Sequence, residues 1–188
     1  MSIFIQGLLD GSVIDVEDNK TTAGTPLDAY PMKFAPGGTP PTAAQLSNAA
    51  NQLWTFADGP IKNSFFIESS LGTNLVIDIK GAKNASGTPV QTYTKKPTGT
   101  TAQNDDAKNQ LWNWVAVDQP GSGLLHMTYY MIQSLLDDNL VIDIVGASTK
   151  AGTLLQVYTK KSTGTTAQFN EAKNQLWSQV PTYIPQPK

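Results

Sequence analysis

The chain has 188 residues, of which 39% are hydrophobic and 15% are charged, so it can bury one substantial core but rarely two. Its formal net charge is −2 at pH 7, and all of its basic residues are lysines, which leaves no arginine to make forked contacts with phosphate groups. This charge balance argues against nucleic acid and against a membrane surface as partners.

The N-terminal segment MSIFIQGLLDGS lacks the basic start and the long apolar stretch of a signal peptide. The longest apolar runs, such as NLVIDI, fall far short of the roughly 20 residues that a membrane-spanning helix needs. The chain has no cysteine, which excludes disulfides and thiol chemistry and is typical of a reducing compartment. We therefore expect a cytoplasmic protein without a transmembrane helix, for which export by a non-classical route stays open.

Short segments rich in β-branched and aromatic residues predict β-strands along most of the chain. In the middle of the chain these segments are, in order, residues 65–70 (FFIESS), 74–79 (NLVIDI), 89–94 (PVQTYT) and 111–117 (LWNWVAV). Small polar segments such as GAKNASG and TGTTAQ separate strands and are predicted to be connections. No long helical pattern is present, although residues 104–110 (NDDAKNQ) are long enough for one helical or 3₁₀ turn.

The chain contains an internal duplication, because residues 73–112 align with residues 138–177 without a gap and 27 of the 40 positions are identical. A third, more diverged copy precedes both and leads from SVIDVEDNKTTAGTPLDAY into the first of three NQLW sequences. The repeats cover approximately residues 1–60, 61–120 and 121–182, and residues 183–188 form a tail. About four strands in each unit predict a single all-β domain with pseudo-three-fold symmetry, of which the β-trefoil is the simplest form.

The three NQLW sequences end at Trp54, Trp112 and Trp177, which are three of the four tryptophans. Three symmetry-related core positions require three similar residues, and burial of an indole removes a large apolar area from water. We therefore expect these three tryptophans in the core. Trp114, which occurs in one copy only, is expected to be a packing residue too.

Gln-x-Trp once per third of the chain, with an Asp upstream, resembles the ricin B-type (R-type) lectins over almost the whole chain. The resemblance implies a β-trefoil fold with the Gln-x-Trp tryptophans in the shared core. It also implies that each third carries a shallow sugar site of the galactose type.

The alternation of strand residues predicts which side chains face away from the core. In NLVIDI, three hydrophobic side chains share one face and leave Asp78 on the other, and the same alternation places Asp15 and Asp143 outside the core. On the next strand of each unit, an amide or a second acid shares the polar face with a tyrosine: Gln91 with Tyr93, Gln156 with Tyr158, and Asp28 with Tyr30.

Such a set suits a neutral sugar, because a carboxylate accepts hydrogen bonds from two adjacent hydroxyls, an amide supplies a donor, and an aromatic ring stacks on the pyranose. In R-type lectins an upstream Asp, the Gln-x-aromatic pair and the Asn of Asn-Gln-x-Trp take these roles. The resemblance therefore implies a second site of Asp78, Gln91, Tyr93 and Asn109, a third site of Asp143, Gln156, Tyr158 and Asn174, and a first site of Asp15, Asp28, Tyr30 and Asn51.

The first site departs from this pattern, since Asp28 stands where the other two sites have Gln, and it ranks below them. Three further amides, Gln52, Gln110 and Gln175, are expected to orient the sites from behind. The long connections between each tyrosine and the following Asn border the sites and either extend or cover them.

We therefore expect a lectin that binds galactose- or N-acetylgalactosamine-type glycans through shallow, multivalent sites, and that behaves as an agglutinin. No catalysis, cofactor or metal is expected. The expected partners are glycans and glycoconjugates, with no nucleic acid and no membrane insertion, and homodimer formation stays open.

Alternatives to a lectin also follow from the sequence. The repeated Asp residues can be purely structural, because an Asp before a turn also binds nearby backbone amides. Long loops such as APGGTPP can instead act on a protein target, as in protease-inhibitor trefoils. A Ser-His-Asp enzyme is disfavoured, since the only histidine, His126, lies in GSGLLHM and is expected at a strand start.

Overall fold

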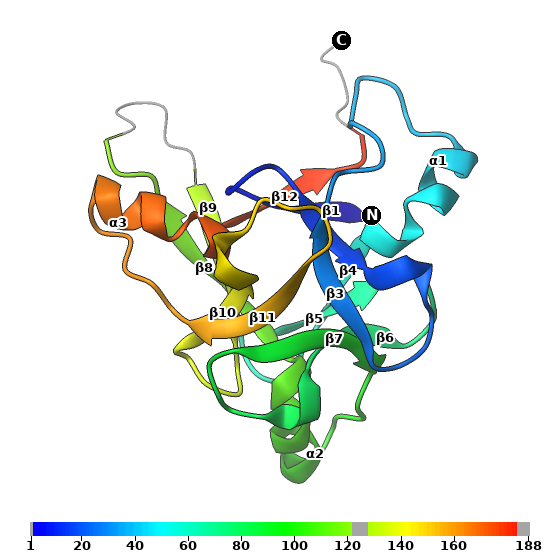
Figure 1. The fold of residues 1–188 in the computed structure, drawn as a ribbon. Coiled ribbons are helices and arrows are strands. Elements are labelled where there is room, and N and C mark those ends of the chain that lie inside the picture. Colours follow the sequence, from blue (N-terminus) through cyan, green and yellow to red (C-terminus); the bar gives the residue numbers. More distant parts are fainter. Residues whose placement is uncertain (1, 122–127, 184–188) are drawn as a thin grey trace.

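The computed structural model describes residues 2–121 and 128–183, in which twelve strands form one antiparallel sheet (Figure 1). The strands fall into three lobes of four. The first lobe contains β1 (Ile3–Gly7), β2 (Val13–Val16), β3 (Thr25–Tyr30) and β4 (Trp54–Asp58). The second contains β5 (Phe65–Ser69), β6 (Leu75–Ile79), β7 (Thr88–Thr94) and β8 (Trp112–Asp118), and the third contains β9 (Thr128–Ser134), β10 (Leu140–Ile144), β11 (Thr153–Thr159) and β12 (Trp177–Pro181).

The outer strands of the three lobes close a six-stranded barrel. The pairs β1 with β12, β4 with β5, and β8 with β9 run along most of their length. Single bridges between β1 and β4, β5 and β8, and β9 and β12 complete the ring.

The remaining strands form three hairpins that cap the barrel, namely β2–β3, β6–β7 and β10–β11. The hairpins also pair with one another, through β3 with β7, β7 with β11, and β11 with β3. Figure 1 shows β3, β7 and β11 around the centre of the molecule. A barrel with a triangular hairpin cap is a β-trefoil, so the predicted all-β fold with pseudo-three-fold symmetry is confirmed.

The three tryptophans of the NQLW sequences lie in the central core, as predicted. Trp54, Trp112 and Trp177 have no exposed surface. Their indole Nε1 atoms donate to the backbone oxygens of Ile14, Ile77 and Ile142, each at 3.1 Å. The same four-residue sequence therefore recurs because each lobe buries one indole against the same hairpin strand and satisfies its only donor there.

Trp114 packs at the edge of this core, as predicted for a packing residue. Its ring stacks on Phe65 with centroids 5.4 Å apart, and it meets Phe56 and Tyr130 edge-on at 5.5 and 5.4 Å. Aromatic pairs at these separations add favourable contacts beyond the area that they bury.

Each lobe carries one short α-helix before its NQLW segment: α1 (Ala43–Asn48), α2 (Thr101–Asp106) and α3 (Thr166–Glu171). A threonine begins each helix with a capping box, in which Thr100 accepts from the Gln103 amide and the Gln103 side chain accepts from Thr100. TGTTAQ, predicted to be a connection, therefore ends inside a helix. The turn expected at residues 104–110 is the end of α2 and the 3₁₀ helix Ala107–Gln110.

The three helices lie at three corners of the molecule (Figure 1). None of the helices in the described parts of the chain is long and apolar enough to span a membrane. His126, which the sequence places at a strand start, lies outside the described residues.

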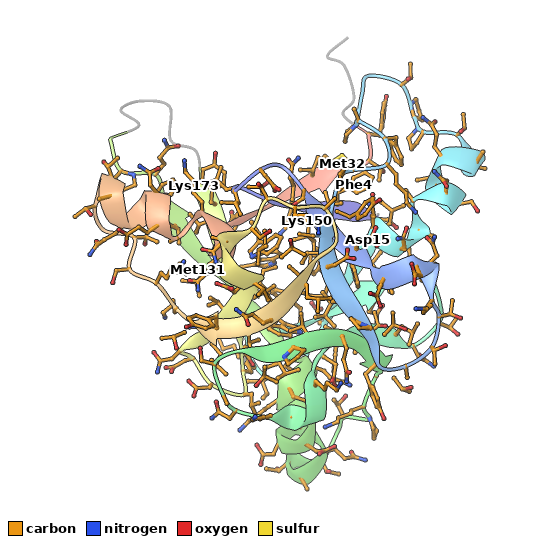
Figure 2. The ribbon with its side chains drawn as sticks, viewed as in Figure 1. Phe4, Asp15, Met32, Met131, Lys150 and Lys173 are labelled. Atoms are coloured by element: carbon orange, nitrogen blue, oxygen red, sulfur yellow. The ribbon has the colours of Figure 1, made fainter. Side chains whose placement is uncertain are left out.

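A small hydrophobic cluster in each lobe joins the outer face of the hairpin to the segment that follows the helix. In the second lobe, Val76 on β6 packs with Phe66, Ala107 and Leu111. The first lobe uses Phe4 in the place of Phe66, and the third uses Met131 (both are labelled in Figure 2). The outer face of β6 is thus covered, and all five of its residues are buried, although the alternation of its sequence predicted one open face.

Replacing Trp112 with Phe tests the role of the indole donor. The Trp112→Phe protein should lose about 2–4 kcal/mol of unfolding free energy, because a cavity forms and the buried Ile77 oxygen loses its partner. Urea denaturation measures the change. Leu154→Ala, at a position that is 45% exposed, serves as the control and should cost less than about 1 kcal/mol. Equal losses in the two variants would contradict this account.

Candidate functional site

An aspartate lies at the same place in each hairpin: Asp15 on β2 (labelled in Figure 2), Asp78 on β6 and Asp143 on β10. These residues are only 4%, 2% and 2% exposed, because the NQLW segment of the same lobe covers them. Burial raises the pKa of all three carboxyls, since desolvation disfavours the charged form, and amide hydrogen bonds oppose the rise.

The prediction that an acid and a ring of each lobe face solvent together is therefore wrong for the acids and correct for the rings. The buried members of the predicted sets are Asp15, Asp28, Asn51, Asp78, Gln91, Asn109, Asp143 and Asn174. The three tyrosines are the exposed members, and Gln156 is half-buried. The physical reason is the covering segment after each helix, whose position alternation along a strand does not reveal.

Side-chain amides hold each carboxylate in the second and third lobes. Asp78 accepts from Gln91 Nε2 on Oδ1 at 2.9 Å, and from Asn109 Nδ2 and Gln110 Nε2 on Oδ2 at 2.7 and 3.0 Å. Asp143 accepts from the equivalent amides, Gln156, Asn174 and Gln175, at the same distances. The structure thus brings the predicted Asp, Gln and Asn of these lobes together, with side-chain amides as the partners of the acid.

The fully buried glutamine of each NQLW segment also binds the backbone around the site. Gln110 Nε2 donates to Thr94 O at 3.0 Å, and its Oε1 accepts from the Lys96 backbone at 2.8 Å. Gln52 and Gln175 make the same pair of contacts in their lobes. These residues lie behind the acid, in the place that the sequence predicted for them.

A lysine that was not predicted from the sequence joins each site. Lys33, Lys96 and Lys161 donate from Nζ to the Oδ1 of Asn51, Asn109 and Asn174 at 2.7, 2.9 and 2.7 Å. Each also donates to a backbone oxygen of the last residue of the α-helix that follows it in the chain. Each lysine comes three residues after the site tyrosine in all three repeats, and this spacing is the signal that could have identified it.

Exposed tyrosine rings complete the sites. Tyr30, Tyr93 and Tyr158 are 44%, 43% and 43% exposed, so the long connections leave the rings open. In the third lobe, Tyr158 lines a hollow of about 340 Å³ together with the other predicted residues of that site and Lys161. In the first lobe, the four predicted residues line a hollow of about 350 Å³. In the second lobe, Tyr93 follows Gln91 by two positions on β7, on the same side of the strand.

A glycine turn of the neighbouring lobe borders each site, and each glycine has a positive φ, which favours a residue without Cβ. The backbone N–H of this glycine donates to a backbone oxygen of the site's own lobe. The accepting residue is the one that follows Gln91, Gln156 or Asp28 in the chain. These contacts join Gly24 to Thr92, Gly87 to Val157 and Gly152 to Ala29 at 2.7, 2.8 and 2.9 Å. Every site is therefore built from two lobes.

The first lobe differs from the others at Asp28. Asp28 lies directly across from Asp15 in the register of β2 and β3, and its Oδ1 is buried without a hydrogen-bond partner. Asp15 accepts instead from Asn51 Nδ2 on both oxygens, at 2.8 Å each, and from Gln52 Nε2 at 2.8 Å. Desolvation, followed by the charge of Asp15, raises the pKa of Asp28 to about 7.

Comparison with known proteins yields a match to one family. The family described as ricin-type β-trefoil lectin domain-like matches residues 50–158. No curated protein sequence matches the chain significantly.

Several solved structures share the fold. The designed three-fold symmetric protein ThreeFoil is similar over 95% of this chain and 97% of its own, with a TM-score of 0.64 and 21% identity. The C-half of an earthworm R-type lectin, solved in complex with GalNAc, is similar over 95% of this chain and 97% of its own, with a TM-score of 0.55 and 19% identity. An exo-β-1,3-galactanase from Clostridium thermocellum has a TM-score of 0.66 and 20% identity, over 96% of this chain and 30% of the galactanase.

Asp28→Gln should stabilise the protein, and more strongly at high pH. The folded-state pKa of about 7 lies above the ordinary aspartate pKa of 3.8, so between these values the folded state binds a proton that the unfolded state does not, and stability falls as pH rises through this range. The variant removes this fall and restores the Gln-to-Asp hydrogen bond of the other lobes. Urea denaturation should show a gain about 1–3 kcal/mol larger at about pH 8 than at about pH 5.

The reciprocal substitution, Gln91→Asp, is the matched control in the second lobe. It places a second carboxylate opposite Asp78, so its cost should grow from about pH 5 to about pH 8. A gain for Asp28→Gln that does not change with pH would show that Asp28 is not the titrating group.

Proposed function

The chain belongs to the ricin-type β-trefoil lectin domain-like family. Lectins bind carbohydrates, and we propose that this chain binds galactose- and N-acetylgalactosamine-type glycans without catalysis. The second and third sites are the principal ones. A neighbour of the same fold, the earthworm R-type lectin C-half, was solved in complex with GalNAc, which supports a ligand of this class.

The observation that carries the proposal is the third-lobe hollow, in which an acid held by amides lies beside an exposed ring. Asp143 accepts three N–H groups, and a carboxylate has about four lone-pair positions, so it keeps acceptor capacity on Oδ1. Tyr158 offers an apolar face to the pyranose, while the hollow of about 340 Å³ is large enough for one sugar residue. Galactose suits this set, because its 3- and 4-hydroxyls form an adjacent pair and one face of its ring is apolar.

The hydrogen bonds of the ligand-free site give Asn174 a different role from the one that the sequence suggested. Asn174 Nδ2 already donates to Asp143 at 2.7 Å and to Ile144 O at 3.2 Å, which uses both of its hydrogens. Lys161 Nζ donates to two acceptors and has three hydrogens. We therefore assign hydroxyl recognition to Asp143, Gln156 and Lys161, and assign Asn174 to positioning of the acid and the lysine.

Binding without cleavage at the two principal sites is supported by the residue that lies opposite the acid in the second and third lobes. Glycoside hydrolysis uses a pair of carboxyl groups on either side of the scissile bond. In the second and third lobes the residue across from the acid is an amide, Gln91 or Gln156, in the strand register. A single acid fixed by amides is suited to holding hydroxyls and lacks the second acid for proton transfer.

Multivalency strengthens weak sites. A shallow site with a few hydrogen bonds and one stacked ring has a dissociation constant on the order of 1 mM to 10 µM. Several sites on one body gain about a hundredfold or more against a clustered glycan surface, without any new contact. Agglutination of glycan-bearing surfaces is the behaviour that follows.

Removal of the two stacking rings tests the proposal. A Tyr93→Ala/Tyr158→Ala protein should lose at least about tenfold in affinity for galactose-agarose, because each ring contributes on the order of 1 kcal/mol of contact. Both rings are more than two-fifths exposed, so the fold should be unaffected. Column retention with and without free galactose measures the effect, and a glycan array identifies the preferred sugar.

Leu46→Ala is the control, since Leu46 is an exposed hydrophobic residue on α1 and lines neither the first-lobe nor the third-lobe hollow. It should bind the column as the wild type does. If column retention is unchanged by free galactose and by the double substitution, the alternative of a protein target bound by the loops is favoured.

A further inference from the structure

We propose that the hollow of the first lobe binds a hexose that carries a protonated amine, such as galactosamine, in preference to a neutral sugar. The inference rests on the proposed function, in that it takes the hollows to be hexose sites. It concerns the chemical class of ligand at one of them.

The hollow of the first lobe has an acidic lining. Four carboxylates line it, from Asp15, Glu17, Asp18 and Asp28, together with one lysine, Lys33. The third-lobe hollow has one carboxylate and one lysine, Asp143 and Lys161. Glu17 and Asp18 lie in the 3₁₀ helix after β2, where the third lobe has Val145 and Gly146. The same backbone therefore surrounds two hollows of different charge.

One acid of this hollow, Asp28, has an oxygen without a hydrogen-bond partner. Asp28 is 7% exposed and lines the hollow, and its Oδ1 has no hydrogen-bond partner. In the other lobes this position holds Gln91 or Gln156, whose Nε2 donates to the central Asp at 2.9 Å. The first lobe lacks that N–H group, and Asp is shorter than Gln by one methylene. A ligand ammonium supplies the missing N–H donors and the missing positive charge.

The neighbouring lysines do not supply that charge to Asp28. Lys33 Nζ donates to Asn51 Oδ1, Asn48 O and Asn19 Oδ1 at 2.7, 2.9 and 3.1 Å, which accounts for all three of its hydrogens. Lys20 pairs at the surface with Asp18 at 2.9 Å and lies 4.0 Å from Glu17. Both lysines therefore have other partners.

The hollow has the features of a sugar site more than those of a metal site. Both oxygens of Asp15 already accept amide hydrogens, which leaves them poor ligands for a cation that needs six to eight oxygens. In the described part of the chain no group of three His, Cys, Asp or Glu residues is arranged to hold a metal ion. Tyr30 lies at the rim with 44% exposure, like Tyr158, and the volumes of the two hollows are about 350 and 340 Å³.

The experiment compares sugars on the full chain in the Tyr93→Ala/Tyr158→Ala background, which leaves the first site intact. NMR titrations at about pH 7 and low salt use galactosamine, galactose, N-acetylgalactosamine and a simple alkylamine. Galactosamine should bind at least about tenfold more tightly than the two neutral sugars, and added salt should weaken only its binding. The alkylamine should bind more weakly than galactosamine, because it lacks the ring that stacks on Tyr30.

Asp28→Gln and Asp28→Asn in the same background should abolish the preference for the amine, and the conservation of the fold is checked by the unfolding transition. The inference would be overturned by an equal affinity for galactosamine and galactose, or by a preference for galactosamine that survives both substitutions. It would also be overturned if the alkylamine bound as tightly as galactosamine, or if calcium ions displaced galactosamine. Titration of the wild type with galactose separates the two proposals: sugar binding at the second and third sites without an amine preference at the first refutes only this inference, whereas no sugar binding at any site refutes the proposed function.

Discussion

A buried carboxylate in each lobe is held by amides that belong to the same short segment as the core tryptophan. In the second lobe, Asn109 and Gln110 bind Asp78, Leu111 enters the small cluster above the hairpin, and Trp112 enters the central core. A segment with these contacts cannot shift without disturbing both the core and the site. A rotation of Asp78 away from Asn109 and Gln110 would leave buried polar groups unpaired, which is costly. The acid is therefore held in one orientation in the absence of ligand. Such preorganisation reduces the ordering cost of binding.

The symmetric backbone carries different side-chain chemistry in its three lobes. The second and third lobes share 27 of 40 positions over the compared stretch, and their acids have the same amide partners. In the first lobe, Asp28 changes the partner of the central acid and leaves a carboxylate oxygen without a donor. Each glycine turn contacts the site of the neighbouring lobe, so a substitution in one lobe can alter the site of the next. One chain therefore presents two kinds of hollow on a single scaffold.

Much of the fold could be predicted from the sequence, because its signals are repeated. The three NQLW sequences marked the buried indoles, and the repeat length indicated three units of four strands. The composition of the sites was also readable, since Asp143, Gln156 and Asn174 do lie together in the structure. These predictions succeeded where one local pattern recurred at symmetry-related places.

The burial of the acids could not be predicted, because alternation in a strand reports two faces but does not say what covers the second. Asp78 was placed correctly on the face opposite Ile77, yet that face packs under the segment after α2. The role of Lys96 was missed for a similar reason: a lysine pair in a connection is typical of a solvated surface, and only the fold brings its Nζ to Asn109. Long-range contacts of this kind depend on how a loop returns to the hairpin, which local sequence does not specify.

The pairing of β1 with β12 has a consequence for biosynthesis. Its five residue pairs run from Ile3 with Pro181 to Gly7 with Trp177, so β1 meets this neighbour only after all of the chain between them has been synthesised. Contacts with such wide sequence separation are slow to form, because the long intervening chain must first be closed into a loop. Until then, one edge of this apolar strand lacks its partner, and an unpaired strand edge is a site at which other chains can pair.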